Sequence, residues 1–249
     1  MLTYTNVSYR RGLSRRPIFD DFSFQFAAFP CALLGPNGAG KSTLLQLTAT
    51  ALRPSTGQIG LALGKQRSTA SRSDLRRRIA LVSQTPSGFR GLTVREAVAY
   101  AGWLKGLSRA EAWERSISTI DRMNLSALAD VSSIRISGGE LRRLAIAQAL
   151  VINPEVLLLD EATTGLDPSE RRNLLEIIAD IADTVPTLAA THEVDDLQSV
   201  FAHVAVLLDG RILFDGPTGD FLGASDGNLS PRERAEHAYA RALNSGAIA

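Results

Sequence analysis

Eight consecutive residues carry the types and spacing that bind a chain of phosphates. The pattern G-x-x-x-x-G-K-[ST] is matched in full by Gly35-Pro36-Asn37-Gly38-Ala39-Gly40-Lys41-Ser42. Glycines let backbone N–H groups point inward around an anion, and a helix that begins after the loop aims its positive end at that anion. Lys41 then supplies charge to phosphate oxygens, and Ser42 offers its hydroxyl to Mg²⁺. The alternative, a flexible turn, does not explain the lysine and hydroxyl.

Two adjacent carboxylates, Asp160 and Glu161, follow the apolar run Val156–Leu159. Such a run is typical of a strand buried on both faces of a parallel sheet. Doubly wound sheets bind their ligands at the carboxyl ends of the strands. We therefore expect Asp160 to hold Mg²⁺ through water and Glu161 to accept a proton from an attacking water molecule. The alternative is a strand that ends in two solvated acids.

The elements that must position these groups alternate between strands and helices. Phe22, Phe24 and Phe26 alternate with polar residues, a period of two that predicts a strand. Short apolar runs predict further strands at 31–34, 79–82, 156–159 and 187–190, and a hairpin is predicted around Asp209-Gly210. Helices are predicted at 42–51, through much of 86–152, after Asp167, and at about 231–243. This order predicts an α/β fold with a mostly parallel sheet.

Three segments within or near the helical stretch fit the capping box, a hydroxyl residue followed three positions later by a carboxylate. They are Thr93–Glu96, Ser108–Glu111 and Ser137–Glu140. Each predicts the start of a helix.

Composition excludes several classes of protein. Hydrophobic residues make up 45% of the 249 residues and charged residues 21%, which excludes long disorder and fits one large domain or two small ones. The 27 basic and 26 acidic side chains leave a net charge of +1, so the whole chain has no strong attraction to nucleic acid or an anionic membrane.

Cysteine content and hydropathy suggest where the chain works. Cys31 is the single cysteine, which excludes an intramolecular disulfide and favours a reducing, cytosolic compartment. No apolar run approaches the ~18–20 residues that span a bilayer, and the polar residues 1–10 do not fit a signal peptide. If the protein works at a membrane, we expect another chain to cross it.

Further motifs, taken with the loop and the carboxylates, resemble the nucleotide-binding subunit of an ATP-binding cassette (ABC) transporter. In the family's order, Gln84 resembles the Q-loop glutamine, Ser137-Gly138-Gly139-Glu140 the signature motif, Gly165-Leu166-Asp167 the D-loop, and His192 the switch histidine. Tyr9 lies 26 residues before Gly35, where the family stacks an aromatic ring on adenine. The resemblance covers about residues 1–222.

Each of these later motifs has a plainer interpretation on its own. Ser137–Glu140 fits a helix cap, Gln84 an ordinary loop residue, His192 an exposed or structural histidine, and Tyr9 a strand aromatic. Asp167 fits a helix N-cap, which is compatible with a functional role. Their order and spacing favour the family for all of them except Tyr9.

The resemblance implies a P-loop NTPase core of the RecA-like type with a mostly parallel sheet. It also implies an N-terminal antiparallel β-subdomain and an inserted α-helical subdomain at about 86–152. The nucleotide-binding domain then spans 1–222, and 223–249 form a linker and a C-terminal helix. That helix packs on its own domain, on a second copy or on a partner, and its small alanine-rich face favours its own domain.

The resemblance also implies ATP hydrolysis, with ATP and Mg²⁺ as cofactors. Two copies, expected to be identical chains, pair head to tail with ATP between Gly35–Thr43 of one and Ser137–Glu140 of the other. The catalytic residues implied are Lys41, Gln84, Glu161 and His192; the metal residues are Ser42, Gln84 and Asp160; the remaining nucleotide contacts are Tyr9, Thr43 and Asp167.

A membrane permease on separate chains is the other partner that the resemblance implies. Gln84 would couple the site to the helical region around 86–105, which would face that permease. The subunit would lie in the cytoplasm, on the inner face of the cell membrane, and no nucleic acid is expected. The segments 92–96, 102–107 and 207–216 are similar to the exporter branch called ABC-2. The sequence identifies neither the cargo nor the permease.

The sequence departs from the family pattern at three places. Glu140 stands where glutamine is common, and its charge would weaken an ATP sandwich by roughly 1 kcal/mol unless it turns toward Ser137 or a neighbouring arginine. Ala162 replaces the proline that usually follows the catalytic glutamate, which removes rigidity but no chemistry. Phe29-Pro30 stands where a Gly-Glu turn is common, so we expect a different turn there.

Two other functions compete with transport. A non-transport ABC ATPase acting on nucleic acid or in translation finds support in the basic stretch Lys65, Arg67, Arg72, Arg76, Arg77 and Arg78, which a solvated face also explains. A nucleotide-sensing module without useful hydrolysis is disfavoured by the presence of Asp160, Glu161 and His192 together.

Overall fold

The computed structural model describes residues 1–12, 16–62, 71–192, 197–223 and 231–246. These residues group into two compact units, which are described separately. Unit 1 comprises 1–75 and 187–249, and unit 2 comprises 76–186. Helix α2 (Arg72–Arg78) contains the boundary between them. The predicted domain boundaries at 86, 152 and 222 are not tested by this grouping and stay predictions.

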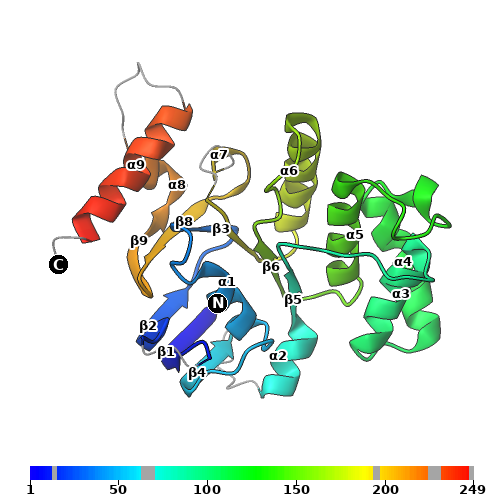
Figure 1. Cartoon of the computed structure of the whole chain (residues 1–249), viewed down its shortest axis with the longest axis horizontal. Coiled ribbons are helices and arrows are strands. Elements are labelled where there is room, and N and C mark those ends of the chain that lie inside the picture. The colour runs from blue at the N-terminus through cyan, green and yellow to red at the C-terminus, as the bar shows by residue number, and fades with distance from the viewer. Residues whose placement is uncertain (13–15, 63–70, 193–196, 224–230, 247–249) are drawn as a thin grey trace. The chain divides into compact units, whose positions relative to one another are not determined.

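An antiparallel sheet of three strands opens unit 1, in the order β2-β1-β4 (Figure 1). Its strands are β1 (Leu2–Tyr9), β2 (Phe19–Phe26) and β4 (Thr56–Leu61). Leu2, Tyr4 and Val7 on β1 are buried, and the Tyr4 ring packs edge-on against Phe22 and Phe26. One face of the sheet thus forms a core, as the alternating phenylalanines predict.

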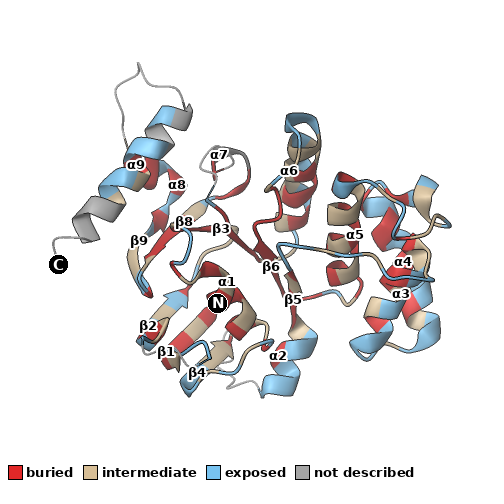
Figure 2. Cartoon of the chain, in the orientation of Figure 1, coloured by how far each residue is buried: buried red, intermediate tan, exposed pale blue. Residues whose placement is uncertain are grey.

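The parallel strands of unit 1 lead into the phosphate-binding loop. Strand β3 (Cys31–Leu34) pairs in parallel with β7 (Thr187–Ala190) on one side and with β8 (His203–Leu208) on the other. All four residues of β3 and of β7 are buried (Figure 2). Helix α7 (Leu197–Val200) lies between β7 and β8 in the chain. Before β3, the Phe29–Pro30 peptide bond is cis.

The hairpin predicted around Asp209-Gly210 is confirmed. Strand β9 (Arg211–Pro217) pairs antiparallel with β8, and Asp209 and Gly210 have φ angles of 45° and 74°. Positive φ at both turn positions is the geometry of a type I′ turn, which suits the twist of the two strands.

Helix α1 (Lys41–Thr48) follows the loop and is shorter than the predicted 42–51. Thr50 adopts a left-handed φ of 59°, and the N–H groups of Ala51 and Leu52 both donate to the carbonyl of Gln46. These contacts satisfy carbonyls at the end of the helix and stop it before Ala51.

The C-terminal helix packs within unit 1. Helix α9 (Pro231–Gly246) contacts α8 (Thr218–Leu222), β8 and β9, and Figure 1 shows it beside α8 and β9. Ala238 faces this contact and is 3% exposed. Of the alternatives that the sequence leaves open, packing on its own unit is the one seen.

Unit 2 contains two parallel strands and most of the helices. Strand β5 (Ile79–Val82) pairs with β6 (Val156–Asp160), which is buried along its length. The helices are α3 (Val94–Leu104), α4 (Arg109–Arg122), the short 3₁₀ helix η1 (Ser126–Leu128), α5 (Gly138–Leu150) and α6 (Pro168–Ala182). The predicted α/β fold, with its antiparallel N-terminal sheet, mostly parallel sheet and helical insert, is confirmed.

Two of the three predicted capping boxes form completely. Thr93 and Glu96 exchange both hydrogen bonds at the start of α3, and Ser137 and Glu140 do so at the start of α5. Ser108 accepts from the Glu111 N–H, but the Glu111 carboxylate turns to Arg115 at 2.7 Å. The third capping box is therefore incomplete, because the Glu111 carboxylate pairs with Arg115, one helical turn later, and not with the Ser108 N–H.

Candidate active site

The backbone of the loop at 35–42 cannot accept side chains at two of its glycines. A Cβ on Gly35 would lie 2.4 Å from the Leu207 carbonyl oxygen. Gly40 has a φ of 104°, and a Cβ there would lie 3.0 Å from Ile18 and Phe19. Neighbouring strands therefore require a bare backbone at these positions, which keeps N–H groups accessible to an anion.

Lys41 is held by the loop that precedes it. Its Nζ donates to the carbonyl oxygens of Gly35, at 2.6 Å, and Pro36, at 3.3 Å, and the residue is only 5% exposed. A buried ammonium needs partners, and the loop supplies two. The cation is thus fixed at the start of α1, where the helix dipole also favours an anion. Ser42 and Thr43 lie in the same first turn.

Tyr9 and His192 also belong to unit 1. Tyr9 ends β1 and pairs with Phe19, the residue whose ring lies against Gly40. The Thr191 N–H donates to the Leu33 carbonyl at 3.2 Å, so the exposed His192 follows β7 at the edge where β3 enters the loop. The structure therefore brings both residues to the neighbourhood of the loop, although their roles stay predictions.

In unit 2, the structure brings Gln84 and Glu161 together. Val82 on β5 pairs in parallel with Leu159 on β6, so the residues that follow both strands emerge at one edge of the sheet. Gln84 Nε2 donates to Glu161 Oε2 at 2.7 Å. Asp160 and Glu161 are 3% and 8% exposed, respectively. The idea of two solvated acids at the end of a strand is therefore wrong, because both carboxylates are buried.

Glu161 adopts a backbone conformation that is rare for its residue type. Its φ is 48°, in the left-handed region, and its carbonyl accepts from the Thr164 N–H at 3.2 Å. This conformation costs a non-glycine residue roughly 1–2 kcal/mol, and it persists where the surroundings hold it. The chain therefore turns sharply at the carboxylate.

The signature segment forms the N-terminus of α5. Ser137 Oγ accepts from the Glu140 N–H at 3.3 Å, and the Ser137 N–H donates to Glu140 Oε2 at 2.6 Å. The Ser137 backbone bond lowers the pKa of the Glu140 carboxyl most, with smaller contributions from the Ser137 side chain and Arg143. The stabilisation is thus present above the unfolded pKa of this carboxyl and is lost as pH falls through the folded one.

The orientation of Glu140 answers a question that the sequence leaves open. The carboxylate turns to the Ser137 N–H, and none of the arginines that the structure describes forms an ion pair with it; Arg143 instead bonds Glu170 at 3.0 Å. Glu140 keeps its charge, but that charge is engaged by the cap.

Asp167 caps helix α6, as the sequence predicts. Its Oδ1 accepts from the N–H groups of Ser169, at 2.9 Å, and Glu170, at 3.0 Å. The role in nucleotide binding that the resemblance implies stays a prediction. Glu170 also approaches the signature segment, since a Cβ on Gly139 would lie 2.2 Å from Glu170 Oε2.

The motifs did not single out Arg142, whose guanidinium bonds the loops that follow β5 and β6. It donates to the carbonyl oxygens of Gln84 and Thr164, the latter at 3.2 Å. Glu170 and Arg143 were missed in the same way. The sequence contains one signal for these arginines. Arg142 and Arg143 follow Gly139 by three and four positions, so in a helix both lie on the same face as Gly139.

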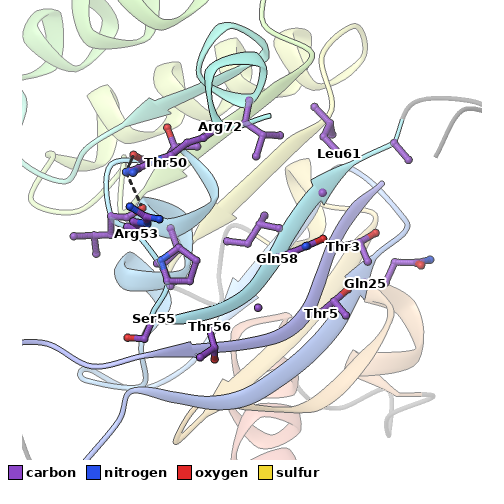
Figure 3. Close-up of a pocket in the computed structure, with 18 of the residues that line it drawn as sticks. Thr3, Thr5, Gln25, Thr50, Arg53, Ser55, Thr56, Gln58, Leu61 and Arg72 are labelled. Atoms are coloured by element: carbon purple, nitrogen blue, oxygen red, sulfur yellow. Dashed lines mark hydrogen bonds between the residues drawn. The ribbon is translucent and has the colours of Figure 1, made fainter. Parts of the chain in front are cut away.

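A hollow in unit 1 lies elsewhere, beside β4 and the chain after α1 (Figure 3). Thr3, Gln25 and Gln58 are among its polar residues. Arg72 Nη2 donates to the carbonyls of Thr50, at 2.8 Å, and Leu52, at 3.4 Å, so the chain itself engages this cation. Among the residues that the structure describes, none of the predicted site residues lines the hollow.

Within the described ranges, no helix is long and apolar enough to cross a membrane. The described residues likewise contain no cluster of three or more His, Cys, Asp or Glu side chains that would hold a metal ion.

Comparison with known proteins identifies the family of the chain. Residues 19–164 match the ABC transporter family. The daunorubicin/doxorubicin resistance ATP-binding protein DrrA of Streptomyces peucetius is 39% identical over 84% of this chain and 63% of its own length. The methionine import ATP-binding protein MetN of Caulobacter vibrioides is 35% identical over 87% of this chain and 67% of its own. This chain thus spans about two thirds of the length of these relatives.

Solved structures share the fold. An ATP-binding subunit of an ABC transporter superposes with a TM-score of 0.77 at 24% identity, over 98% of this chain and 99% of that one. A dimeric ATP-binding cassette in a post-hydrolysis state with ADP and phosphate gives 0.74 at 22% identity, over 88% and 99%. The family match and the 39% identical relative show that the chain belongs to the ABC transporter family, as an ATP-binding subunit.

Proposed function

We propose that this chain hydrolyses ATP to power export through separate membrane subunits. The observation that carries the hydrolytic part is the 2.7 Å hydrogen bond from Gln84 Nε2 to Glu161 Oε2. It fixes a buried carboxylate at the carboxyl ends of two parallel strands, where this fold class binds its ligands.

Glu161 is the proposed general base. The oxygen of a water molecule bonds to the γ-phosphorus of ATP, the bond from that phosphorus to the ADP oxygen breaks, and the proton of the water passes to the Glu161 carboxylate. Gln84 orients the carboxylate through Oε2, and Lys41 and the loop amides hold the phosphates. His192, at the end of β7, is proposed to contact the γ-phosphate.

Mg²⁺ fits the oxygen donors that the chain offers. Ser42 provides a hydroxyl, Gln84 an amide oxygen and Asp160 a carboxylate, which are the hard ligands that Mg²⁺ prefers. Mg²⁺ is commonly bound by one or two carboxylates together with substrate phosphates, and Asp160 would supply one carboxylate. When bound, the ion would neutralise charge on the phosphate oxygens.

We propose that ATP bound to the loop of one copy is also contacted by the signature segment, Ser137–Glu140, of a second copy. The N–H groups of the first residues of α5, among them Gly138, have no partner within the helix, and a helix N-terminus attracts phosphate. ATP would then join two identical chains head to tail, and hydrolysis would release them. Dimeric cassettes among the solved relatives support this arrangement.

A membrane subunit is proposed to contact an exposed aromatic patch on unit 2. Phe89, Tyr100 and Trp103 form it, with ring centroids 5.6 and 5.7 Å apart along the series, and Leu104 beside them is 59% exposed. Exposed apolar residues that cluster in this way mark interaction surfaces. The patch falls in the region around 86–105, and it would hold the chain on the inner face of the cell membrane.

Export rests on motif similarity and on one relative. The segments 92–96, 102–107 and 207–216 are similar to the ABC-2 exporter branch, and the 39% identical relative is a drug resistance protein. Other relatives are named for import, among them MetN and a cobalt import ATP-binding protein of Rhodobacter capsulatus, 38% identical. The direction therefore needs its own experiment.

Action on nucleic acid is the second candidate function. Lys65 and Arg67 of the basic stretch lie outside the described residues. Of the others, Arg72 bonds backbone carbonyls and Arg78 pairs with Glu155 at 2.6 Å. Arg76 and Arg77 are the other exposed cations of this stretch within the described residues, and two arginines are a small surface for a phosphate backbone.

Replacing the base should abolish turnover and keep binding. We expect Glu161→Gln to bind ATP normally and to lower ATP hydrolysis by ~10²–10⁴-fold, the usual effect of a positioned base. Lys41→Ala should instead weaken ATP binding, since it removes charge from the phosphate site. Phosphate release and calorimetric ATP binding measure the two effects. Undiminished turnover in Glu161→Gln would remove this residue from the role.

Removing the charge of Glu140 should strengthen the ATP-driven dimer. Glu140→Gln keeps an oxygen for the Ser137 N–H but removes like charge near the incoming triphosphate, worth roughly 1 kcal/mol, or about fivefold in ATP concentration. Light scattering across an ATP titration measures the dimer fraction. Glu114→Gln, an exposed change on α4, is the control. Equal midpoints for Glu140→Gln and the unmodified chain would contradict the expectation.

A charge on the aromatic patch should detach the membrane subunit. Leu104→Glu should reduce co-purification of the permease at least tenfold while the ATP hydrolysis of the isolated chain stays the same. Ile117→Glu on α4 is a matched control, because Ile117 is 53% exposed and Leu104 is 59% exposed. Quantitative mass spectrometry of pull-downs gives the ratio. If both variants retain the permease equally, the patch is not the docking surface.

Inverted membrane vesicles test the direction of transport. Vesicles that contain the chain and its co-purifying permease are supplied with ATP and daunorubicin, a fluorescent probe chosen for the similarity to DrrA. Export predicts ATP-dependent accumulation inside these vesicles, absent in Glu161→Gln. ATP-dependent loss of probe from preloaded vesicles would reverse the assignment to import.

A further inference from the structure

We infer that Arg142 is a positioning residue for Glu161, a role that rests on the proposed function of Glu161 as the base. Arg142 lies on α5, within the first two turns after Ser137. Its guanidinium does not touch the reacting atoms. It holds the two loops that carry Glu161 and its partner Gln84.

The guanidinium bridges two loops that are distant in sequence. Nη1 donates to the Gln84 carbonyl oxygen, and Nη2 donates to the Thr164 carbonyl oxygen at 3.2 Å. One loop follows β5 and the other follows β6. A planar guanidinium carries several donors in a rigid fork, so a single side chain can fix both carbonyls at once.

Each residue held by Arg142 is itself bonded to Glu161. The Gln84 side chain donates to Glu161 Oε2 at 2.7 Å, and the Thr164 N–H donates to the Glu161 carbonyl at 3.2 Å. The contacts thus form a closed ring through Arg142, Gln84, Glu161 and Thr164. One side of the ring orients the Glu161 carboxylate, and the other maintains the turn of its backbone.

The backbone of Glu161 requires this support. Its φ of 48° is disfavoured for a residue with a side chain, and such conformations persist only where neighbouring groups hold them. Burial lowers the pKa of the Arg142 guanidinium. Arginine nevertheless stays charged at neutral pH, which makes its bonds to carbonyls stronger than those of a neutral donor. A lysine at this position could not reach both carbonyls with the same geometry.

Arg122 offers a matched control in the same unit. Its Nη2 donates to the Asp180 carbonyl at 3.1 Å and to Thr184 Oγ1 at 3.0 Å. It therefore ties α4 to the C-terminal end of α6 through two oxygen acceptors, and neither acceptor belongs to a proposed site residue. A substitution of Arg122 therefore measures what the loss of arginine hydrogen bonds costs when Glu161 and its partners are not involved.

The first test separates kcat from KM. Arg142→Met in the full chain should lower kcat for ATP hydrolysis about 10–100-fold and leave KM within about twofold, because nucleotide binding does not depend on Glu161 placement. Arg142→Lys should recover only part of the loss, and Arg122→Met should keep kcat within about twofold. Rates are expressed per ATP-binding site, measured by calorimetry, so that misfolded protein does not count. A change confined to KM, or equal effects of Arg142→Met and Arg122→Met, would overturn the inference.

The second test is a double-mutant cycle. Because Arg142 acts through Glu161, the variant R142M/E161Q should hydrolyse ATP within about twofold of E161Q in single-turnover assays. Effects that multiply would mean that Arg142 acts independently, and the positioning role would be wrong. The two proposals fail differently: an active E161Q removes the base itself, whereas an inactive E161Q with a fully active R142M removes only the positioning role.

Discussion

The parallel pairing of β5 with β6 is the constraint on which the acidic part of the site depends. It brings Val82 opposite Leu159, so the chain leaves both strands at one edge, and Gln84 meets Glu161 there. A carboxylate that is 8% exposed is costly to keep charged without a donor, and the amide of Gln84 supplies one. A register shift of one residue would move the two side chains apart.

In unit 1, too, two parallel strands end side by side and are followed by proposed site residues. Strands β3 and β7 run parallel, and their carboxyl ends lead to the loop and to His192, respectively. The loop adds a second constraint, since the Leu207 carbonyl leaves no room for a Cβ on Gly35 and Gly40 has a φ that side chains disfavour. In both units, the strands are apolar and buried, and the proposed site residues lie at or directly after the strand ends. This division lets the core be rigid while the polar residues occupy the edge.

The parts predictable from sequence are those that depend on neighbours in the chain. Four apolar residues in β6, the spacing from Gly35 to Ser42, and the Ser137–Glu140 cap are all local patterns, and the structure contains each. Arg142 could not be found in this way, because its contact with Gln84 spans 58 positions. The direction of the Glu140 side chain was likewise open, since the sequence offers it both an N-cap and arginines. The contacts of α5 with two loops decide the first, and the Ser137 N–H decides the second.

Helix α5 links two proposed functions of the site. Its first residues would contact the ATP of a second copy, and Arg142 holds the loops around Glu161 of its own chain. A helix rises 1.5 Å per residue, so Gly138 and Arg142 lie about 6 Å apart along one rigid element. A shift of this helix when ATP joins the two copies would therefore move the guanidinium with it. The position of the proposed base in one copy would then depend on nucleotide bound by the other, and this dependence would tie hydrolysis to the assembled dimer.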